Sequence, residues 1–78
     1  MSGWETISIA AEMEKGRTEK IVFQISEIEG IPKADIRIFF IDKDGQWRST
    51  RRGINISSDA IDEFCQCAES LSTACERG

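Results

Sequence analysis

The sequence contains no histidine, few cysteines and no long apolar run. Without histidine, general acid-base catalysis at neutral pH loses its commonest side chain, and a structural zinc site would need four thiolates or a carboxylate in place of one. The three cysteines, Cys65, Cys67 and Cys75, fall in one segment with helical spacing. Cys65 and Cys67 would point about 200° apart on a helix, which places them poorly for pairing. We therefore expect no enzyme activity, no metal, no cofactor, and cysteines that act as small apolar side chains in a reducing compartment.

Membrane-directing features are also missing from the sequence. No apolar run approaches the ~20 residues that a membrane-spanning helix needs. The N-terminus, "MSGWETISIA", lacks the basic start and apolar stretch of a signal peptide. We therefore expect a cytoplasmic protein that does not contact a membrane.

Positive charge is scarce overall but concentrated in the middle of the chain. The formal net charge is −4, which taken alone argues against nucleic acid as a partner. Residues 1–30 carry three basic and six acidic groups, residues 31–57 carry six and three, and residues 58–78 carry one and five. The three segments therefore have net charges of −3, +3 and −4, and the middle one is where an anionic partner is expected.

Seventy-eight residues are expected to form one domain, 1–78, near the lower size limit for a single core, so a dimer would be a natural support. Alternating apolar and polar residues predict strands at about 4–14, 18–28, 34–42 and 46–56. Strict alternation in the first strand would put Ile9, Ala11 and Met13 on one face. The stretch "DKDG" predicts a hairpin turn in which Asp42 and Asp44 bond their own backbone, rather than a catalytic carboxylate pair.

The apolar period changes from that of a strand to that of a helix after Ser57. Ser57 is a candidate N-cap, and the helix is expected at about residues 58–75. Its apolar face is broader than packing on one sheet requires. That face contains Ile61, Phe64, Cys65, Ala68 and Leu71. The expected fold class is therefore α+β, with an antiparallel four-stranded sheet followed by one C-terminal helix.

Arginines and aromatic residues gather on the third and fourth expected strands. A groove for single-stranded nucleic acid needs cations that follow the phosphates and flat rings on which bases stack. The candidates are Arg37, Phe39 or Phe40, Trp47, Arg48, Arg51 and Arg52. The alternative is a solvated face whose arginines pair with Asp35, Asp42 or Glu side chains and whose rings belong to the core.

The spacing leaves two interpretations each for Arg51 and for Trp47. Alternation puts Arg51 on the opposite face from Arg48 and Arg52, so either a bulge lies among them or one of the three is not a ligand. Trp47 either provides a surface for a base or packs under the helix.

The order of these residues resembles a known family. The pattern "DIRIFF-IDKDGQW-RSTRRGINIS-SDAIDEF" lies within residues 34–64. It is similar to the single-stranded-DNA-binding domain of the transcriptional positive cofactor four family, which also has small bacterial members. The shared elements are an Asp-Ile-Arg triplet before two aromatic positions, a turn with Asp and Gly, a basic-basic-Gly-aliphatic strand end and a capped helix.

The resemblance implies a strongly curved sheet and a homodimer that pairs through helices and strands, with Ile61, Phe64, Cys65, Ala68 and Leu71 in the interface. It implies sequence-tolerant binding of single-stranded DNA without catalysis, in transcription regulation or other DNA metabolism, and a place at the nucleoid in a bacterium. The alternatives are a protein-interaction dimer that has lost DNA binding, and a binder of single-stranded RNA.

The resemblance also assigns residues to the expected site. Arg37 matches an arginine that contacts DNA, Phe40 matches an aromatic on which bases stack, and Arg48, Arg51 and Arg52 match basic contacts of the last strand. Where the family's eukaryotic members have an aromatic and a lysine, this chain has Ile28 and Glu29. The basic cluster around the first hairpin, which consists of Lys15, Arg17 and Lys20, either compensates for this loss or is a solvated turn.

Overall fold

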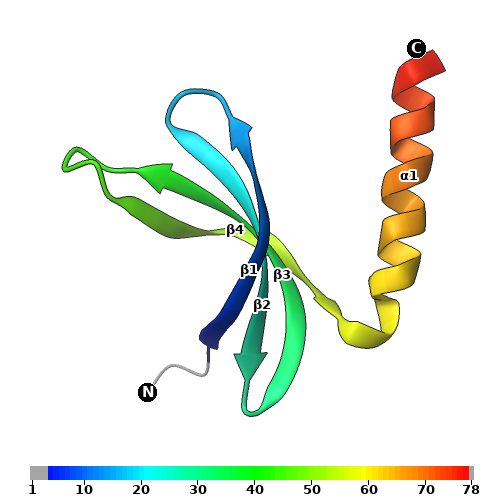
Figure 1. Ribbon diagram of the computed structural model, residues 1–78, viewed down its shortest axis with the longest axis horizontal. Helices are drawn as coiled ribbons and strands as arrows, with labels where there is room; N and C mark the ends of the chain where they lie inside the picture. The colour runs from blue at the N-terminus through cyan, green and yellow to red at the C-terminus, as the bar shows by residue number, and fades with distance from the viewer. Residues whose placement is uncertain (1–3, 78) are drawn as a thin grey trace.

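The computed structural model describes residues 4–77, which form one antiparallel sheet followed by a helix (Figure 1). The elements are β1 (Trp4–Lys15), β2 (Glu19–Ile28), β3 (Ile31–Ile41), β4 (Trp47–Ser57), a short 3₁₀ helix η1 (Ser58–Ala60) and α1 (Ile61–Arg77). The strand order in space is β1-β2-β3-β4, so each strand pairs with its neighbour in sequence. This arrangement confirms the expected α+β fold class.

Two hairpin turns follow from local chemistry. Asp42 Oδ1 accepts hydrogen bonds from the backbone N–H groups of Asp44 and Gln46, both at 2.9 Å, as expected of "DKDG". The β2–β3 turn has only two residues, Glu29 and Gly30, with φ values of 52° and 80°. Positive φ at both positions is typical of a tight turn that matches the twist of the strands. Because this turn is so short, β3 begins at Ile31, earlier than the expected residue 34.

The alternation expected in the first strand is wrong, because β1 contains two bulges. The register with β2 shifts between Thr6 and Ser8 and again between Ile9 and Ala11. Ile9 consequently lies opposite Gln24, whereas Ala11 lies opposite Phe23. Since opposed residues share a face of an antiparallel pair, Ile9 and Ala11 lie on opposite faces of the sheet.

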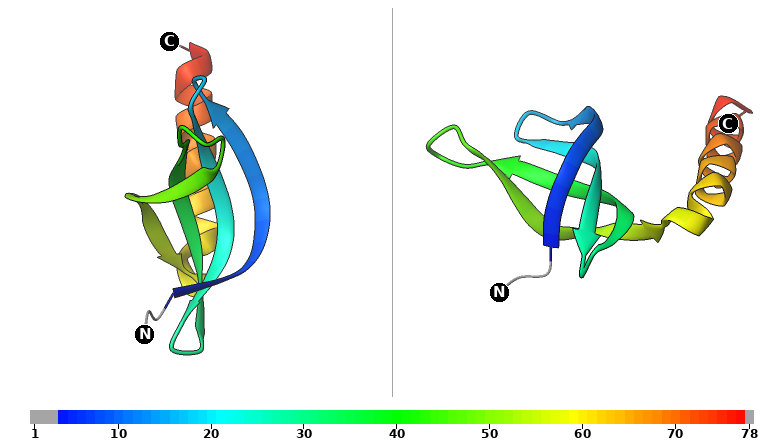
Figure 2. Two further views of the ribbon diagram at one scale, coloured as in Figure 1. Left: turned by 90° about the vertical axis from the view of Figure 1, so that its left-hand side faces the viewer. Right: turned by 60° about the horizontal axis from the view of Figure 1, so that its bottom comes forward.

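The sheet curls so strongly that its two edge strands approach each other over one face (Figures 1 and 2). Thr6 on β1 and Ser49 on β4 line the same hollow, although β1 and β4 lie at opposite edges of the sheet. The face inside the curl contains the buried polar side chains of Gln24, Ser26 and Asp35, and Val22 shares this face because it pairs with Arg37. We call this surface the inner face. The outer face is apolar and includes Met13, Phe23, Ile36 and Ile54.

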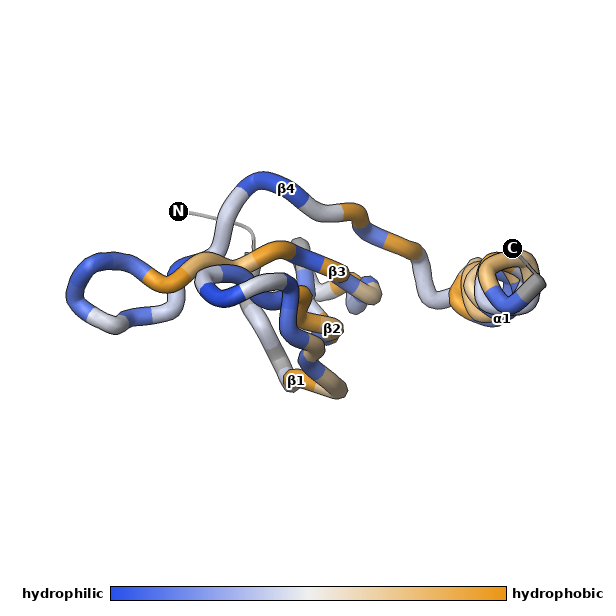
Figure 3. The backbone as a smooth tube through the Cα atoms, turned by 90° about the horizontal axis from the view of Figure 1, so that it is seen from above, coloured by the Kyte–Doolittle hydropathy of each residue, from blue (hydrophilic) through white to orange (hydrophobic). Residues whose placement is uncertain are grey.

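The helix α1 stands beside the sheet and covers neither face (Figure 3). It meets the sheet through η1 and the end of β4, where Ile61 lies against Ile25 and Pro32 in a small apolar hollow. Leu71, farther along the helix, is 66% exposed. Ser57 is the extended residue before η1 and makes no side-chain capping bond within the described chain, so η1 precedes the α-helix and delays its start to Ile61.

The single chain has little core of its own. Among the residues whose burial the structure describes, Val22 is the one fully buried hydrophobic side chain. The radius of gyration is 14.2 Å, compared with about 11.5 Å for a compact chain of this length. Apolar surface therefore remains exposed both on the outer face of the sheet and along α1.

Candidate nucleic-acid interface

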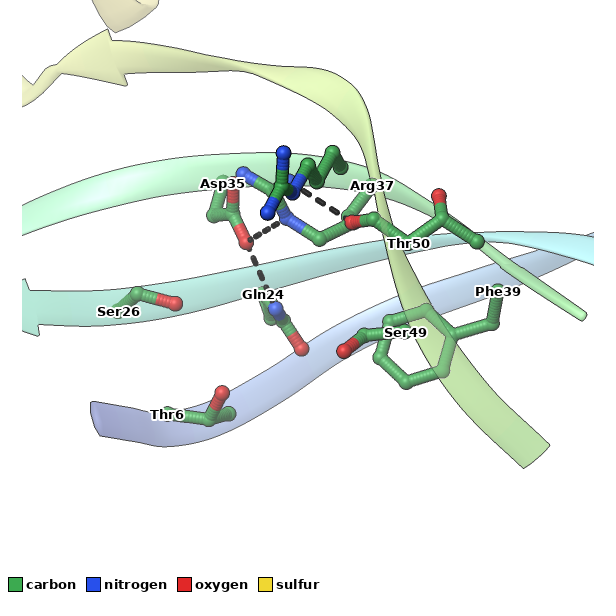
Figure 4. A pocket seen from close by; sticks show the side chains of 9 residues that line it. Thr6, Gln24, Ser26, Asp35, Arg37, Phe39, Ser49 and Thr50 are labelled. Atoms are coloured by element: carbon green, nitrogen blue, oxygen red, sulfur yellow. Dashed lines mark hydrogen bonds and ion pairs between the residues drawn. The ribbon is translucent and has the colours of Figure 1, made fainter. Parts of the chain in front are cut away.

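The inner face contains a hollow of about 520 Å³ (Figure 4). Its lining consists of Thr6, Gln24, Ser26, Asp35, Arg37, Phe39, Ser49, Thr50 and Arg51. These residues come from all four strands, which meet here because the sheet curls. Eight of the nine lining residues have polar side chains and the ninth is Phe39, so the hollow combines hydrogen-bonding groups with a flat apolar ring.

Asp35 is the buried centre of the polar network beneath this hollow, and it is only 2% exposed. Its two oxygens accept four hydrogen bonds, from Gln24 Nε2 (2.8 Å), Arg37 Nε (3.0 Å), Arg37 Nη2 (2.7 Å) and Asn55 Nδ2 (2.6 Å). Gln24 on β2 and Asn55 on β4 lie directly opposite Asp35 in the register, so pairing of the strands brings the donors together. Burial alone would raise the pKa of Asp35, but the bonds from Arg37, Gln24 and Asn55 and the charge of Arg37 hold that pKa below its ordinary value.

Arg37 is held on both sides of its guanidinium group. Nε and Nη2 form a bidentate pair with Asp35, and Nη1 donates to the backbone carbonyl of Thr50 at 3.0 Å. The bond to Asp35 raises the pKa of Arg37, so this side chain stays cationic. Arg37 therefore connects β3 to β4 and also presents positive charge at the edge of the hollow.

A large bulge in β4 decides where the neighbouring arginines point. Arg37 pairs with Gly53 and Phe39 pairs with Ser49, so Thr50, Arg51 and Arg52 all lie opposite the single residue Ile38. Thr50 Oγ1 donates to the carbonyl of Ile38 at 2.6 Å and accepts from the backbone N–H of Arg52 at 3.1 Å. A bulge, one of the two alternatives that the arginine spacing left open, is therefore present, but it leaves Arg51 on the opposite face from Arg48 and Arg52.

The two arginines within the bulge have different surroundings. Arg51 lines the hollow and has no ion-pair partner within residues 4–77. Arg52 forms an ion pair with Glu19, which lies on the outer face because it pairs with Phe40. Gly53 allows the strands to approach closely, since a Cβ there would lie 2.5 Å from the carbonyl oxygen of Ile36.

A second hollow, of about 450 Å³, lies near the first hairpin, where inner-face residues meet Glu19 of the outer face. It is lined by Glu12, Glu14, Gly16, Arg17, Glu19, Lys20 and Trp47. Lys20 Nζ lies 4.6 Å from the centre of the Trp47 ring and forms a 3.1 Å ion pair with Glu12. Trp47 is 41% exposed and belongs to this hollow, so the interpretation that it packs under the helix is wrong.

The remaining predicted residues lie on the other face. Lys15, Glu19, Phe40 and Arg48 follow one another across the four strands in the pairing register, so their side chains share the outer face. Lys15 pairs with Glu19 at 3.0 Å and Arg48 with Asp42 at 2.7 Å. Hydrogen bonds from Lys15 and then Arg52 lower the pKa of Glu19.

The nine predicted nucleic-acid contacts are thus divided between two faces. Arg37, Arg51, Arg17, Lys20 and Trp47 lie along the inner face, whereas Lys15, Phe40, Arg48 and Arg52 lie with the outer one. Phe39 rather than Phe40 is the ring beside Arg37. Sequence reasoning named Asp35 as a possible partner of an arginine but missed its bonds to Gln24 and Asn55. The Asp-Ile-Arg triplet was the available signal, because residues two apart on a strand share a face.

Other chemistries have no assembled site in the described part of the chain. No group of three or more metal-ligating side chains gathers within residues 4–77, and the three cysteines are free and exposed. In the same residues, no helix is both long and apolar enough to cross a membrane.

Comparisons with known proteins agree with this architecture. Two crystal forms of BPSL1147, a PC4 homolog from Burkholderia pseudomallei K96243, have similar structures. The tetragonal form has a TM-score of 0.79 at 25% identity, covering 87% of this chain and 98% of that chain. The orthorhombic form has a TM-score of 0.76 at 26% identity, covering 92% and 93%. A comparison with curated protein sequences found no match.

The family comparison covers more than half of the chain. A family model described as "Transcriptional Coactivator p15 (PC4)" matches residues 15–67, from the end of β1 to the second turn of α1. The matched region contains Asp35, Arg37, the β4 bulge and the start of the helix. The resemblance noted in the sequence is therefore confirmed, and the chain belongs to the Transcriptional Coactivator p15 (PC4) family.

Proposed function

We propose that the protein binds single-stranded DNA as a homodimer, with little sequence preference and without catalysis, in transcription regulation or other DNA metabolism. The observation that carries the proposal is the inner face, where Arg37, Arg51 and Phe39 line one hollow and Lys20 and Trp47 line the next. Cations beside the exposed Trp47 ring and the half-buried Phe39 ring meet the needs of a single strand, whose phosphates are charged and whose bases stack. Membership of a nucleic-acid-binding, non-enzymatic family supports it.

The ion pairing of the arginines within the chain supports the proposed phosphate contacts. Arg51 has no intramolecular carboxylate to compete with a phosphate within the described residues. Arg48 and Arg52 are exposed and pair with the half-buried carboxylates of Asp42 and Glu19, and an ion pair open to solvent contributes little and exchanges readily. A phosphate can therefore replace either carboxylate. A strand that contacts both faces would wrap around the β3–β4 end of the sheet.

The homodimer is supported by the apolar surface that one chain leaves exposed. Ile54 on the outer face is 51% exposed and Leu71 on α1 is 66% exposed. A second copy would cover the helix and the apolar part of the outer face around Ile54, and would leave the end of the sheet with Arg48 and Arg52 open. This role is proposed for Ile61, Phe64, Cys65, Ala68 and Leu71. The length of α1, 17 residues, and the exposure of Leu71 on it suit helix pairing across a twofold axis.

Fluorescence polarisation with labelled oligo-dT and with a duplex of equal length tests the DNA-binding proposal, alongside a measurement of mass in solution. We expect oligo-dT to bind more tightly than duplex. If each site neutralises about four phosphates, log affinity should fall against log salt with a slope near −3. Duplex binding that equals or exceeds oligo-dT binding would reject the proposal. Competition between oligo-dT and oligo-rU separates DNA from RNA preference.

A second candidate function, a protein-interaction dimer that has lost DNA binding, is favoured by one specific observation. Five of the proposed cationic contacts already have carboxylate partners within the chain, and they are Lys15, Lys20, Arg37, Arg48 and Arg52. A dimer that shows no oligonucleotide binding at low salt would favour this candidate. A single-stranded-DNA-binding function, by contrast, would place the protein at the nucleoid in a bacterial cytoplasm.

A further inference from the structure

The orientation of one buried amide gives the inner hollow a defined hydrogen-bonding character. Gln24 is 7% exposed, and its Nε2 donates to Asp35 Oδ2 at 2.8 Å. Asp35 is an ionised carboxylate that only accepts hydrogen bonds, so the amide of Gln24 must turn its NH₂ group toward it. The amide oxygen, Gln24 Oε1, must then face away from Asp35.

That oxygen is directed into the hollow (Figure 4). Within the described chain the Gln24 side chain makes no hydrogen bond other than the one to Asp35, so Oε1 is free to accept. It is turned toward the part of the hollow where the hydroxyls of Thr6 and Ser49 lie. Phe39 lies beside Ser49, on the same side of the hollow. The result is an acceptor of fixed direction, two hydroxyls that can rotate to donate, and a flat ring.

We infer that this hollow is a base subsite that takes a thymine or uracil, stacked on Phe39, with its imino N–H donating to Gln24 Oε1. The inference rests on the proposed function and names the base preference of that same site. The preference concerns one nucleotide of the bound strand, while the phosphate contacts remain indifferent to sequence. A hollow of about 520 Å³ is large enough for one base together with its sugar.

The hydrogen-bonding edge of the base decides the preference. Thymine and uracil present an N–H between two carbonyl oxygens, which suits an acceptor flanked by hydroxyls that donate. Cytosine and adenine instead place a ring nitrogen acceptor at the centre of that edge, opposite Gln24 Oε1. Guanine has the imino N–H but carries an amino group where the second carbonyl of thymine lies. When two acceptors face each other, neither has a hydrogen-bond partner. The wrong base therefore loses more binding free energy than one hydrogen bond contributes.

The test uses oligo-dT in which one thymine at a time is replaced by N3-methylthymine, which lacks the imino N–H. Binding of each oligonucleotide to the full-length protein is measured by fluorescence polarisation. At one position of the strand we expect replacement to weaken binding by about tenfold, which is a typical effect of an unsatisfied polar group in a binding site. Replacement of the same thymine by cytosine should weaken binding in the same direction.

Gln24→Leu removes the acceptor while keeping a side chain of similar volume. In this variant the penalty for N3-methylthymine should shrink to within about twofold. Gln66→Leu, an exposed glutamine on α1, is the matched control and should keep the full penalty. The comparison of oligo-dT with its N3-methylthymine forms uses the wild-type protein, so it tests the subsite even if Gln24→Leu folds poorly.

The outcomes separate this inference from the proposed function. Tight binding of oligo-dT with no penalty for N3-methylthymine at any position would overturn the base subsite and leave DNA binding intact. A penalty that persists in Gln24→Leu would also overturn it, because the methyl group would then be excluded by shape alone. Absence of binding to unmodified oligo-dT would reject the proposed function itself, and with it the subsite.

Discussion

Arg37 Nη1 donates a 3.0 Å hydrogen bond to the backbone carbonyl of Thr50, across the point where β4 leaves its regular pairing with β3. The same guanidinium group is anchored at its other side by buried Asp35. One side chain thus holds the strand bulge that directs Arg51 into the inner hollow. The proposed site therefore depends on internal contacts of the sheet as much as on its exposed charges.

Thr50→Val should destabilise the bulge without changing the volume or branching of the side chain. The change removes the bonds of Thr50 Oγ1 to the Ile38 carbonyl and the Arg52 N–H. We expect the free energy of unfolding to fall by about 1–2 kcal/mol, and oligo-dT affinity to fall severalfold because Arg51 is no longer held in place. Urea unfolding and polarisation measure the two effects. Thr73→Val on α1 is the control, and an equal loss of affinity there would contradict the positional role of Thr50.

Arg51→Ala and Arg52→Ala should differ in their effects, although the two residues are adjacent. Arg51 lines the inner hollow and has no carboxylate partner within residues 4–77, whereas Arg52 is paired with Glu19. We expect Arg51→Ala to reduce oligo-dT affinity about tenfold and to make the salt slope shallower by about 0.7, and Arg52→Ala to have a smaller effect. Salt titrations of both variants measure this. A larger loss in Arg52→Ala would place the strand on the outer face.

Phe39→Ala and Phe40→Ala form a second matched pair. Phe39 lines the inner hollow with Arg37, whereas Phe40 is 38% exposed on the outer face opposite Arg48. Loss of a stacked base costs about 1–3 kcal/mol, so Phe39→Ala should weaken oligo-dT binding by about tenfold or more. Phe40→Ala should weaken it less if the strand follows the inner face. The reverse order would favour the stacking role that family resemblance assigns to Phe40.

The lowered pKa of Asp35 predicts that the free energy of unfolding depends on pH in the acid range. Its pKa lies below the ordinary value of 3.8, so the folded protein binds this proton less tightly than the unfolded chain does. The contribution of Asp35 to the free energy of unfolding is therefore complete above pH 3.8 and is lost as the pH falls through the lowered pKa. Chemical unfolding at fixed protein concentration, repeated from pH 7 down to acid, measures this dependence.

Asp35→Asn isolates the contribution of Asp35 to this pH dependence, because it removes the ionisable group. It also replaces one accepting oxygen by an NH₂ group that faces the donors of Gln24, Arg37 or Asn55. We expect it to lower the free energy of unfolding by about 1–3 kcal/mol at pH 7 and to flatten the acid dependence. Asp59→Asn, at an exposed position in η1, is the control. An unchanged acid dependence in Asp35→Asn would mean that other carboxylates control acid unfolding.

Leu71→Asp tests the proposed dimer with little risk to the fold of the single chain. Leu71 is 66% exposed, so the substitution removes almost no contact within one chain, but it would bury a charge in a helix-paired dimer. We expect the mass in solution, measured by light scattering, to fall to that of one chain or a concentration-dependent mixture. Gln66→Asp on the polar side of α1 should leave the mass unchanged. A stable dimer of Leu71→Asp would exclude Leu71 from the interface.

Much of the architecture was predictable because it follows from local patterns. Alternation in the strands, the change of period after Ser57 and the Asp-rich "DKDG" turn are each encoded within a few neighbouring residues. The order of the Asp-Ile-Arg triplet, the turn and the basic strand end was sufficient to identify the family. Regional charge also marked the third and fourth strands as the positive part of the chain.

The sequence by itself determined the strand and helix order, the family and the set of cationic and aromatic candidates. Only the tertiary structure decided which face each candidate occupies. Two bulges in β1 and the three-residue bulge in β4 interrupt the alternation on which face assignments depend. The Asp35 network joins Gln24 and Asn55, which lie 11 and 20 positions away in the sequence. Such contacts depend on register and curl, which are properties of the whole sheet and not of any short segment.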